Sequence, residues 1–183
     1  MSISIRPFDG NFGAEVIGFD FETKGNEDTF QLLRDAWVEH AVICIRHQKI
    51  EPEFFLKLAK IFGEPIPQLI NHKAFALPSH PVISVLSSGH VDTLGSGKPI
   101  NRGGSWHSDH SNTPQPPSGT ILHALQLPSQ GGNTRFTNQT LAYENLSSDM
   151  KKKIEGLKAK HVYQSKYSTR KMPKRSKVDE AIT

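Results

Sequence analysis

Two residues of metal-binding type stand two positions apart in the segment Trp106-His107-Ser108-Asp109. On an extended strand, residues i and i+2 project from the same face, so the His107 imidazole and the Asp109 carboxylate are expected to lie side by side. Such a pair supplies two of the three ligands in the 2-His-1-carboxylate triad that holds non-haem Fe(II). A His-x-Asp pair is also common on protein surfaces, so the surrounding sequence has to decide between a metal site and a surface pair.

The hydrophobic pattern of the 183 residues predicts one α+β domain, 1–183, with helices around an antiparallel sheet system. Helical spacing of apolar residues predicts helices that begin at Glu27 and Pro52, a helical turn over 141–146, and a helix capped by Ser147. Alternating or continuous apolar runs predict these strands: 2–7, 14–19, 41–45, 81–86, 119–127, 133–137 and 157–163. We expect a long glycine-rich loop over 87–104.

Basic residues are concentrated late in the chain. Residues 151–177 carry 11 of the 22 Lys+Arg and a single acid, Glu155. A basic segment can bind nucleic acid, but this one lacks aromatic residues at the spacing that base stacking needs. We therefore predict a solvated end, 151–183, made of a basic helix, a strand and an unstructured tail, with no nucleic-acid partner.

The cysteine count and the apolar runs bear on the compartment. Cys44 is the only cysteine, so disulfides within the chain and cysteine-based zinc sites are excluded. The first residues do not follow the pattern of a signal peptide, and no apolar run is long enough to cross a bilayer. These features predict a cytoplasmic protein without a membrane partner, and they leave a homo-oligomer open.

Four stretches, in matching order and spacing, carry a resemblance to one family. Residues 39–65 are similar to "H-G-V-x-x-F-R-x-Q" followed by "F-G-x-P", and residues 106–109 to "W-H-[ST]-D". Residues 117–134 are similar to "P-P-x-x-x-x-L…P-x-x-G-G-D-T", and residues 142–161 to "A-Y-x-x-L…L-x-A-x-H". These motifs resemble those of the taurine / 2,4-dichlorophenoxyacetate dioxygenase family of Fe(II)- and 2-oxoglutarate-dependent oxygenases.

The resemblance implies a double-stranded β-helix (a jelly roll, as in cupins) with flanking helices, and it implies site residues. His107 and Asp109 would bind Fe(II), and Thr134 would donate a hydrogen bond to a carboxylate of 2-oxoglutarate. The adjacent Gly131 and Gly132 can take positive φ and let the cofactor approach the backbone closely. His72 lies near a position where some family members contact their substrate.

The resemblance also implies that the chain is the N-terminal portion of a longer enzyme with an incomplete jelly roll. The third iron ligand of the family and the arginine that pairs with 2-oxoglutarate would both follow Thr183, and His161 matches a different family position. We expect the complete enzyme to hydroxylate a small, anionic organic substrate with 2-oxoglutarate and O2, releasing succinate and CO2, and the chain alone to be inactive. The alternatives are a truncated, non-catalytic family member, a cupin-like metal-binding protein and a basic nucleic-acid-binding module.

Overall fold

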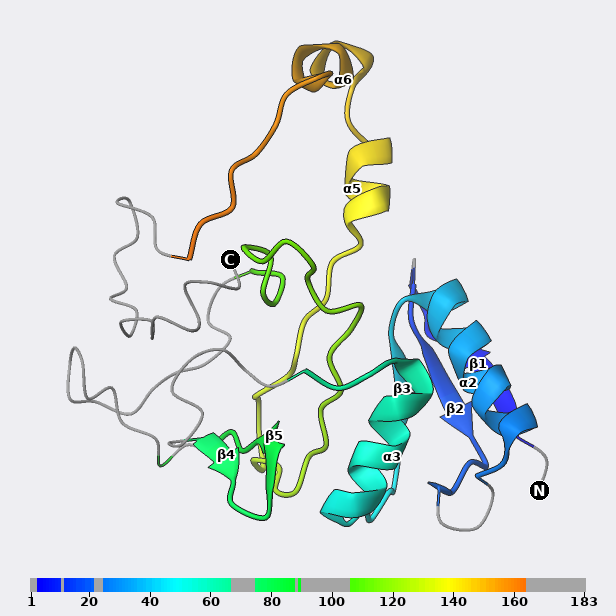
Figure 1. The fold of residues 1–183 in the computed structure, drawn as a ribbon. Helices are drawn as coiled ribbons and strands as arrows, with labels where there is room; N and C mark the ends of the chain where they lie inside the picture. Colours follow the sequence, from blue (N-terminus) through cyan, green and yellow to red (C-terminus); the bar gives the residue numbers. More distant parts are fainter. Residues whose placement is uncertain are drawn as a thin grey trace. The chain divides into compact units, whose positions relative to one another are not determined.

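The computed structural model of the chain describes residues 3–10, 12–21, 25–66, 75–87, 89 and 106–163. The chain divides into two compact units (Figure 1). The first comprises Met1–Phe62 and His123–Lys158, and the second comprises Gly63–Leu122 and Ala159–Thr183. The expectation of a single domain over 1–183 stays a prediction.

A three-stranded sheet forms the base of the first unit. Its strands are β1 (Ser4–Pro7), β2 (Ala14–Ile17) and β3 (Ile43–Ile45), in the order β1-β2-β3. The β1–β2 pair is antiparallel, as in the predicted antiparallel sheet system, whereas the β2–β3 pair is parallel, which the sequence does not predict. A parallel neighbour requires a crossover, and the helix between β2 and β3 provides it.

That crossover helix is α2 (Glu27–His40), and it begins at Glu27 as the sequence predicts. The Asn26 side chain accepts a hydrogen bond from the Thr29 amide, and the Thr29 hydroxyl accepts one from the Asn26 amide. This reciprocal capping box satisfies two backbone donors that would otherwise lack partners. The helix ends at Ala41, which takes a left-handed conformation with φ of 62°.

Helices α2 and α3 (Pro52–Phe62) bury their apolar faces with the sheet to form the core of the first unit. Leu33 of α2 is fully buried, and Phe21 packs against both Phe30 and Phe54, with ring centroids 5.9 and 6.0 Å apart. Trp37 of α2 contacts Phe62 of α3 edge to face, with centroids 5.5 Å apart. The buried cluster consists of Val16, Phe19, Phe21, Leu33 and Leu58.

One carboxylate, that of Glu15, is buried on the opposite face of β2 from Val16. Arg6, its cross-strand partner, donates a hydrogen bond to it, and the Arg46 Nε donates a second one at 2.7 Å. The Arg6 hydrogen bond is the main reason why the pKa of Glu15 lies below its usual range; the bond from Arg46 adds to this effect, and burial opposes it. The two arginines therefore keep a buried group ionised.

The second unit contains a short hairpin of β4 (Ala76–Leu77) and β5 (His80–Ser84), which pair antiparallel. The predicted strand 81–86 is thus present, as β5 over His80–Ser84. The predicted glycine-rich loop, 87–104, lies almost entirely outside the described residues.

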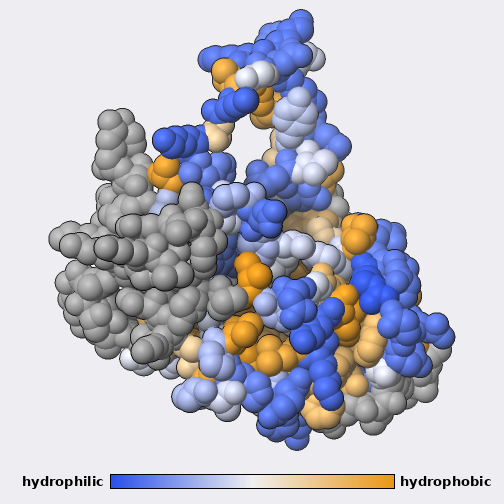
Figure 2. Space-filling model, in the orientation of Figure 1, coloured by the Kyte–Doolittle hydropathy of each residue, from blue (hydrophilic) through white to orange (hydrophobic). Residues whose placement is uncertain are grey.

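Three predicted strands, 119–127, 133–137 and 157–163, are not strands in the structure. A strand needs a neighbour to receive its backbone hydrogen bonds, and these segments have no pairing partner within the described residues. Their apolar side chains are consequently exposed, as at Leu125, where 83% is accessible. Figure 2 shows apolar residues in orange at the surface of the molecule, among hydrophilic ones. The described residues do not contain a complete double-stranded β-helix.

Two short helices, α5 (Gln139–Glu144) and α6 (Ser148–Ile154), are the last helices of the described chain. The Ser147 side chain caps α6 by accepting a hydrogen bond from the Met150 amide at 3.2 Å, as predicted. Residues 164–183 of the predicted basic end lie outside the described residues. Among the helices that the structure describes, none combines the length and the apolar character needed to cross a membrane.

Leu33→Ala should lower the free energy of unfolding by about 2–5 kcal/mol, because it removes a fully buried side chain and leaves a cavity. Val38→Ala on the same helix is the matched control, since 78% of Val38 is exposed and its loss should cost little. Denaturant unfolding followed by circular dichroism measures both. Equal losses in the two variants would contradict the core described above.

Glu15→Gln should lower the unfolding temperature at pH 7 because it removes the charge that both arginines bind. The folded pKa is depressed, so this stabilisation is complete above the unfolded pKa of about 4.3 and is lost as the pH falls from there through the folded pKa. The difference between variant and wild type should therefore shrink in acid. Thermal unfolding at several pH values tests this, with Glu51→Gln, an exposed carboxylate, as the control. A difference that is constant with pH would exclude the explanation.

Candidate metal centre

The structure brings His107 and Asp109 together, although not in the way the sequence predicts. Residues 106–108 are irregular and 109–112 form a turn, so the expected strand is absent. The turn is closed by Thr113, whose amide and hydroxyl both donate to the His110 carbonyl, at 3.0 and 2.9 Å. The His107 Nε2 and the Asp109 Oδ1 nevertheless lie 3.3 Å apart. The side-by-side placement is confirmed, and the strand geometry proposed to produce it is wrong.

The separation of these two donor atoms fits a shared cation. First-row metals bind imidazole nitrogen and carboxylate oxygen at about 2.0–2.2 Å, and ligands in neighbouring positions around one ion then lie about 3 Å apart. The side chains of His107 and Asp109 are 57% and 45% exposed, so both can be reached from solvent. In the part of the chain that the structure describes, no group of three or more His, Cys, Asp or Glu side chains is placed to hold a metal. The described residues thus offer two donor side chains, His107 and Asp109, at a separation that one cation could bridge.

The second oxygen of the Asp109 carboxylate has a partner that sequence reasoning missed. The Thr120 hydroxyl donates a hydrogen bond to Asp109 Oδ2 at 2.8 Å. Eleven positions separate the two residues, and the loop between them has no regular periodicity that would predict the contact. The only sequence signal is that Thr120 falls within the third family-like stretch.

A shallow pocket opens beside Asp109 in the second unit. Its lining is rich in hydroxyl groups and prolines and consists of Ser108, Asp109, Ser111, Pro116, Pro117, Ser118, Gly119 and Thr120. Hydroxyl groups can bind a polar ligand next to the carboxylate. Pro116 and Pro117 fix φ in the part of the loop that precedes Thr120.

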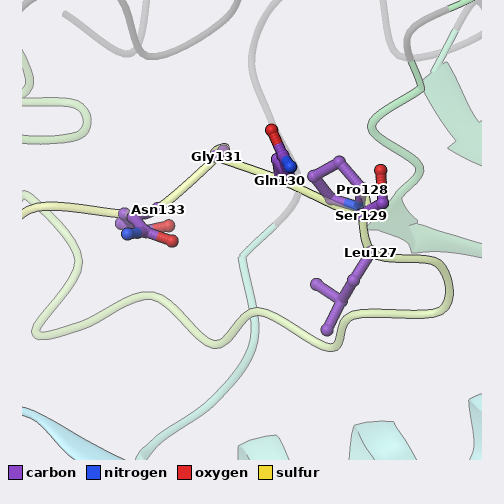
Figure 3. Close-up of a pocket in the computed structure, with 8 residues that line it drawn as sticks. Leu127, Pro128, Ser129, Gln130, Gly131 and Asn133 are labelled. Carbon is purple, nitrogen blue, oxygen red and sulfur yellow. The ribbon is translucent and has the colours of Figure 1, made fainter.

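The segment that contains Thr134 belongs to the first unit and forms a second shallow pocket, lined by residues 127–134. Gly131 and Gly132 have φ of +73° and +70°, as the sequence predicts. A Cβ on Gly132 would lie 2.9 Å from Cγ of Pro128. Glycine is therefore required at this position both because of its positive φ and because a side chain would collide with Pro128. Figure 3 shows Leu127 and Gln130 on different sides of this backbone. Thr134, which carries a hydroxyl group, thus follows a turn whose backbone is not covered by side chains at Gly131 and Gly132.

Of two further histidines, His123 and His72, the structure describes only His123. The His123 Nε2 lies 3.2 Å from the Gln48 carbonyl oxygen, and its ring packs against Phe55 with centroids 6.0 Å apart. His123 is therefore packed within the first unit. His72 lies outside the described residues, so its predicted substrate contact stays a prediction.

Comparison with known proteins gives a consistent family. The sequence profile described as "Taurine catabolism dioxygenase TauD, TfdA family" matches residues 4–181. An alkylsulfatase of Acinetobacter baylyi is 30% identical over 164 residues, which are 87% of this chain and 47% of the relative. An alpha-ketoglutarate-dependent sulfate ester dioxygenase of Pseudomonas putida is 26% identical over 172 residues, or 93% of this chain and 53% of the relative.

A solved structure agrees with these relatives. The crystal structure of a taurine dioxygenase from Burkholderia xenovorans has a TM-score of 0.60 at 28% identity, covering 85% of this chain and 52% of that one. The chain spans about half the length of the relatives that it matches. The profile match includes both 106–109 and 131–134, and the family uses Fe(II) and 2-oxoglutarate. The chain belongs to the TauD/TfdA family of dioxygenases.

Proposed function

We propose that the protein to which this chain belongs is an Fe(II)- and 2-oxoglutarate-dependent dioxygenase. It hydroxylates a C–H bond of a small organic substrate: one oxygen atom of O2 enters the product and the other enters succinate, and CO2 leaves. The observation that carries this proposal is the 3.3 Å separation of His107 Nε2 and Asp109 Oδ1, within residues that the family profile matches.

His107 and Asp109 would hold the iron, together with a third ligand from outside the described residues. Bound Fe(II) supplies the oxidising chemistry that couples decarboxylation of 2-oxoglutarate to hydroxylation. The chain's own residues place the reactants. The Thr134 hydroxyl donates to a carboxylate of 2-oxoglutarate, and the turn at Gly131 and Gly132 leaves the backbone accessible to it. His72 contacts the substrate in this proposal.

The proposed fold of the whole protein is the double-stranded β-helix. The TM-score of 0.60 to a taurine dioxygenase supports this proposal. Segments 119–127 and 133–137 would pair with further strands in it, which would cover the exposed side chains of Leu125 and Leu127.

The proposed substrate is a small organic anion. One relative is named as a dioxygenase of sulfate esters, and another, from Sphingobium herbicidovorans, as an (S)-phenoxypropionate dioxygenase. The shared feature of these substrates is an acidic group attached to a small organic body. We extend that class, and not a single compound, to this protein.

The second candidate function is metal binding without turnover, as in a non-catalytic family member or a cupin-like protein. An exposed pair of donors such as His107 and Asp109 can bind a divalent cation without further chemistry. Succinate formation that depends on 2-oxoglutarate distinguishes the two functions. Binding of Fe(II) without any succinate, in a folded sample of the protein as its gene encodes it, would favour the second.

Asp109→Ala should abolish succinate formation with Fe(II), ascorbate and a panel of sulfate esters and aryloxy acids, because one of the proposed iron ligands is lost. Asp149→Ala is the control, since it removes an exposed carboxylate from the first turn of α6. Succinate release is the measurement. Activity of Asp109→Ala equal to that of wild type would remove Asp109 from the site.

Thr134→Val should raise the KM for 2-oxoglutarate by the equivalent of one hydrogen bond to a charged group, at most about 1.5–3 kcal/mol. Thr134→Ser should have a KM for 2-oxoglutarate close to that of wild type, because serine retains the hydroxyl. Thr137→Val, an exposed threonine of the same segment, serves as the control. If the KM for 2-oxoglutarate is the same in all four proteins, Thr134 does not bind this cosubstrate.

A further inference from the structure

We propose that Thr120 is a positioning residue that orients the Asp109 carboxylate for metal binding. This inference rests on the proposed metal site at His107 and Asp109. The Thr120 hydroxyl donates to Asp109 Oδ2 at 2.8 Å, while Asp109 Oδ1 lies 3.3 Å from His107 Nε2. The two oxygens of one carboxylate therefore have different partners.

That division of partners matters because an aspartate carboxylate rotates easily about its last torsion. The energy profile of this torsion is broad and roughly two-fold, so a carboxylate without a fixed partner samples many orientations. Asp109 is nearly half exposed, and packing alone does not fix its side chain. A hydrogen bond to one oxygen selects the orientation in which the other faces His107. It also favours coordination through Oδ1 alone over coordination through both oxygens.

Thr120 is suited to this role. Its β-branched side chain is short and has few accessible rotamers, so the hydroxyl position is well defined by the backbone. The backbone is in turn restrained on the way back from the turn at 109–112, since Pro114, Pro116 and Pro117 each fix φ. The loop thus presents a hydroxyl to Asp109 at a low cost in conformational entropy.

A purely structural role is the competing explanation, because the same hydrogen bond also closes the loop between Asp109 and Thr120. The two roles differ in what they change. A structural role affects the stability of the fold. A positioning role affects metal affinity and the geometry around the metal while the fold stays intact.

The test is Mn(II) binding to the protein as its gene encodes it, measured from the electron paramagnetic resonance signal of free Mn(II). Thr120→Val keeps the shape of threonine and removes the donor, so we expect affinity to fall about 10–100-fold, as for other outer partners of metal ligands. Thr120→Ser keeps the donor and should bind nearly as wild type does. Thr137→Val controls for the chemistry of the substitution. If Thr120→Val does not fold, Thr120→Ala replaces it.

The outcomes separate this inference from the metal site itself. Loss of affinity in Thr120→Val, recovery in Thr120→Ser and an unchanged unfolding temperature support the inference. A changed visible spectrum of Co(II)-loaded Thr120→Val would support it further, since this spectrum reports the geometry around the metal.

Wild-type affinity in Thr120→Val, with binding abolished in Asp109→Ala, would overturn the role of Thr120 alone. So would an equal loss in Thr120→Ser, or a loss that merely follows the unfolding temperature. If wild type binds no Mn(II), or if Asp109→Ala binds as well as wild type, the metal site fails and this inference fails with it.

Discussion

The packing of α2 and α3 against the three-stranded sheet is the interaction on which the ordered part of the first unit depends. Leu33 is fully buried there, and Phe21 joins the two helices through contacts with Phe30 and Phe54. Burial of large apolar side chains is the main source of folding free energy, so this cluster stabilises the sheet and helices together. Glu15 is buried on the other face of β2, and it has two arginine partners because a buried charge needs compensation.

The segment of His107 and Asp109 in the second unit is built by other means, because no buried apolar cluster is present among the described residues of that unit. Local devices fix its backbone instead: a closed turn after Asp109 and prolines before Thr120. In the first unit, glycines with positive φ precede Thr134. Each device sets a polar side chain within an exposed loop. Functional residues on loops are common, since loops can present polar groups that a packed core could not satisfy. Exposure also leaves the side chains of His107 and Asp109 accessible from solvent.

The exposed apolar side chains of residues 119–127 have a related cause. Side chains such as those of Leu122, Leu125 and Leu127 are exposed because their segments have no strand partner within the described residues. Their alternating pattern is typical of a strand with one buried face. The pattern and the exposure agree if these segments pair with strands from elsewhere in the whole protein, as we propose. The hydrophobic pattern of a segment and its conformation can therefore differ when the segment lacks its neighbours.

The sequence by itself determined the helices, the first strands and the closeness of His107 to Asp109, because these depend on neighbouring residues. Helix ends at Asn26 and Ser147, the positive φ of Gly131 and Gly132, and the closeness of His107 to Asp109 are all local consequences of residue type and spacing. Only the tertiary structure decided which runs became strands, that β2 and β3 run parallel, and that Thr120 reaches Asp109. The physical reason is that backbone pairing and contacts across loops need partners far along the chain, and no local pattern specifies them.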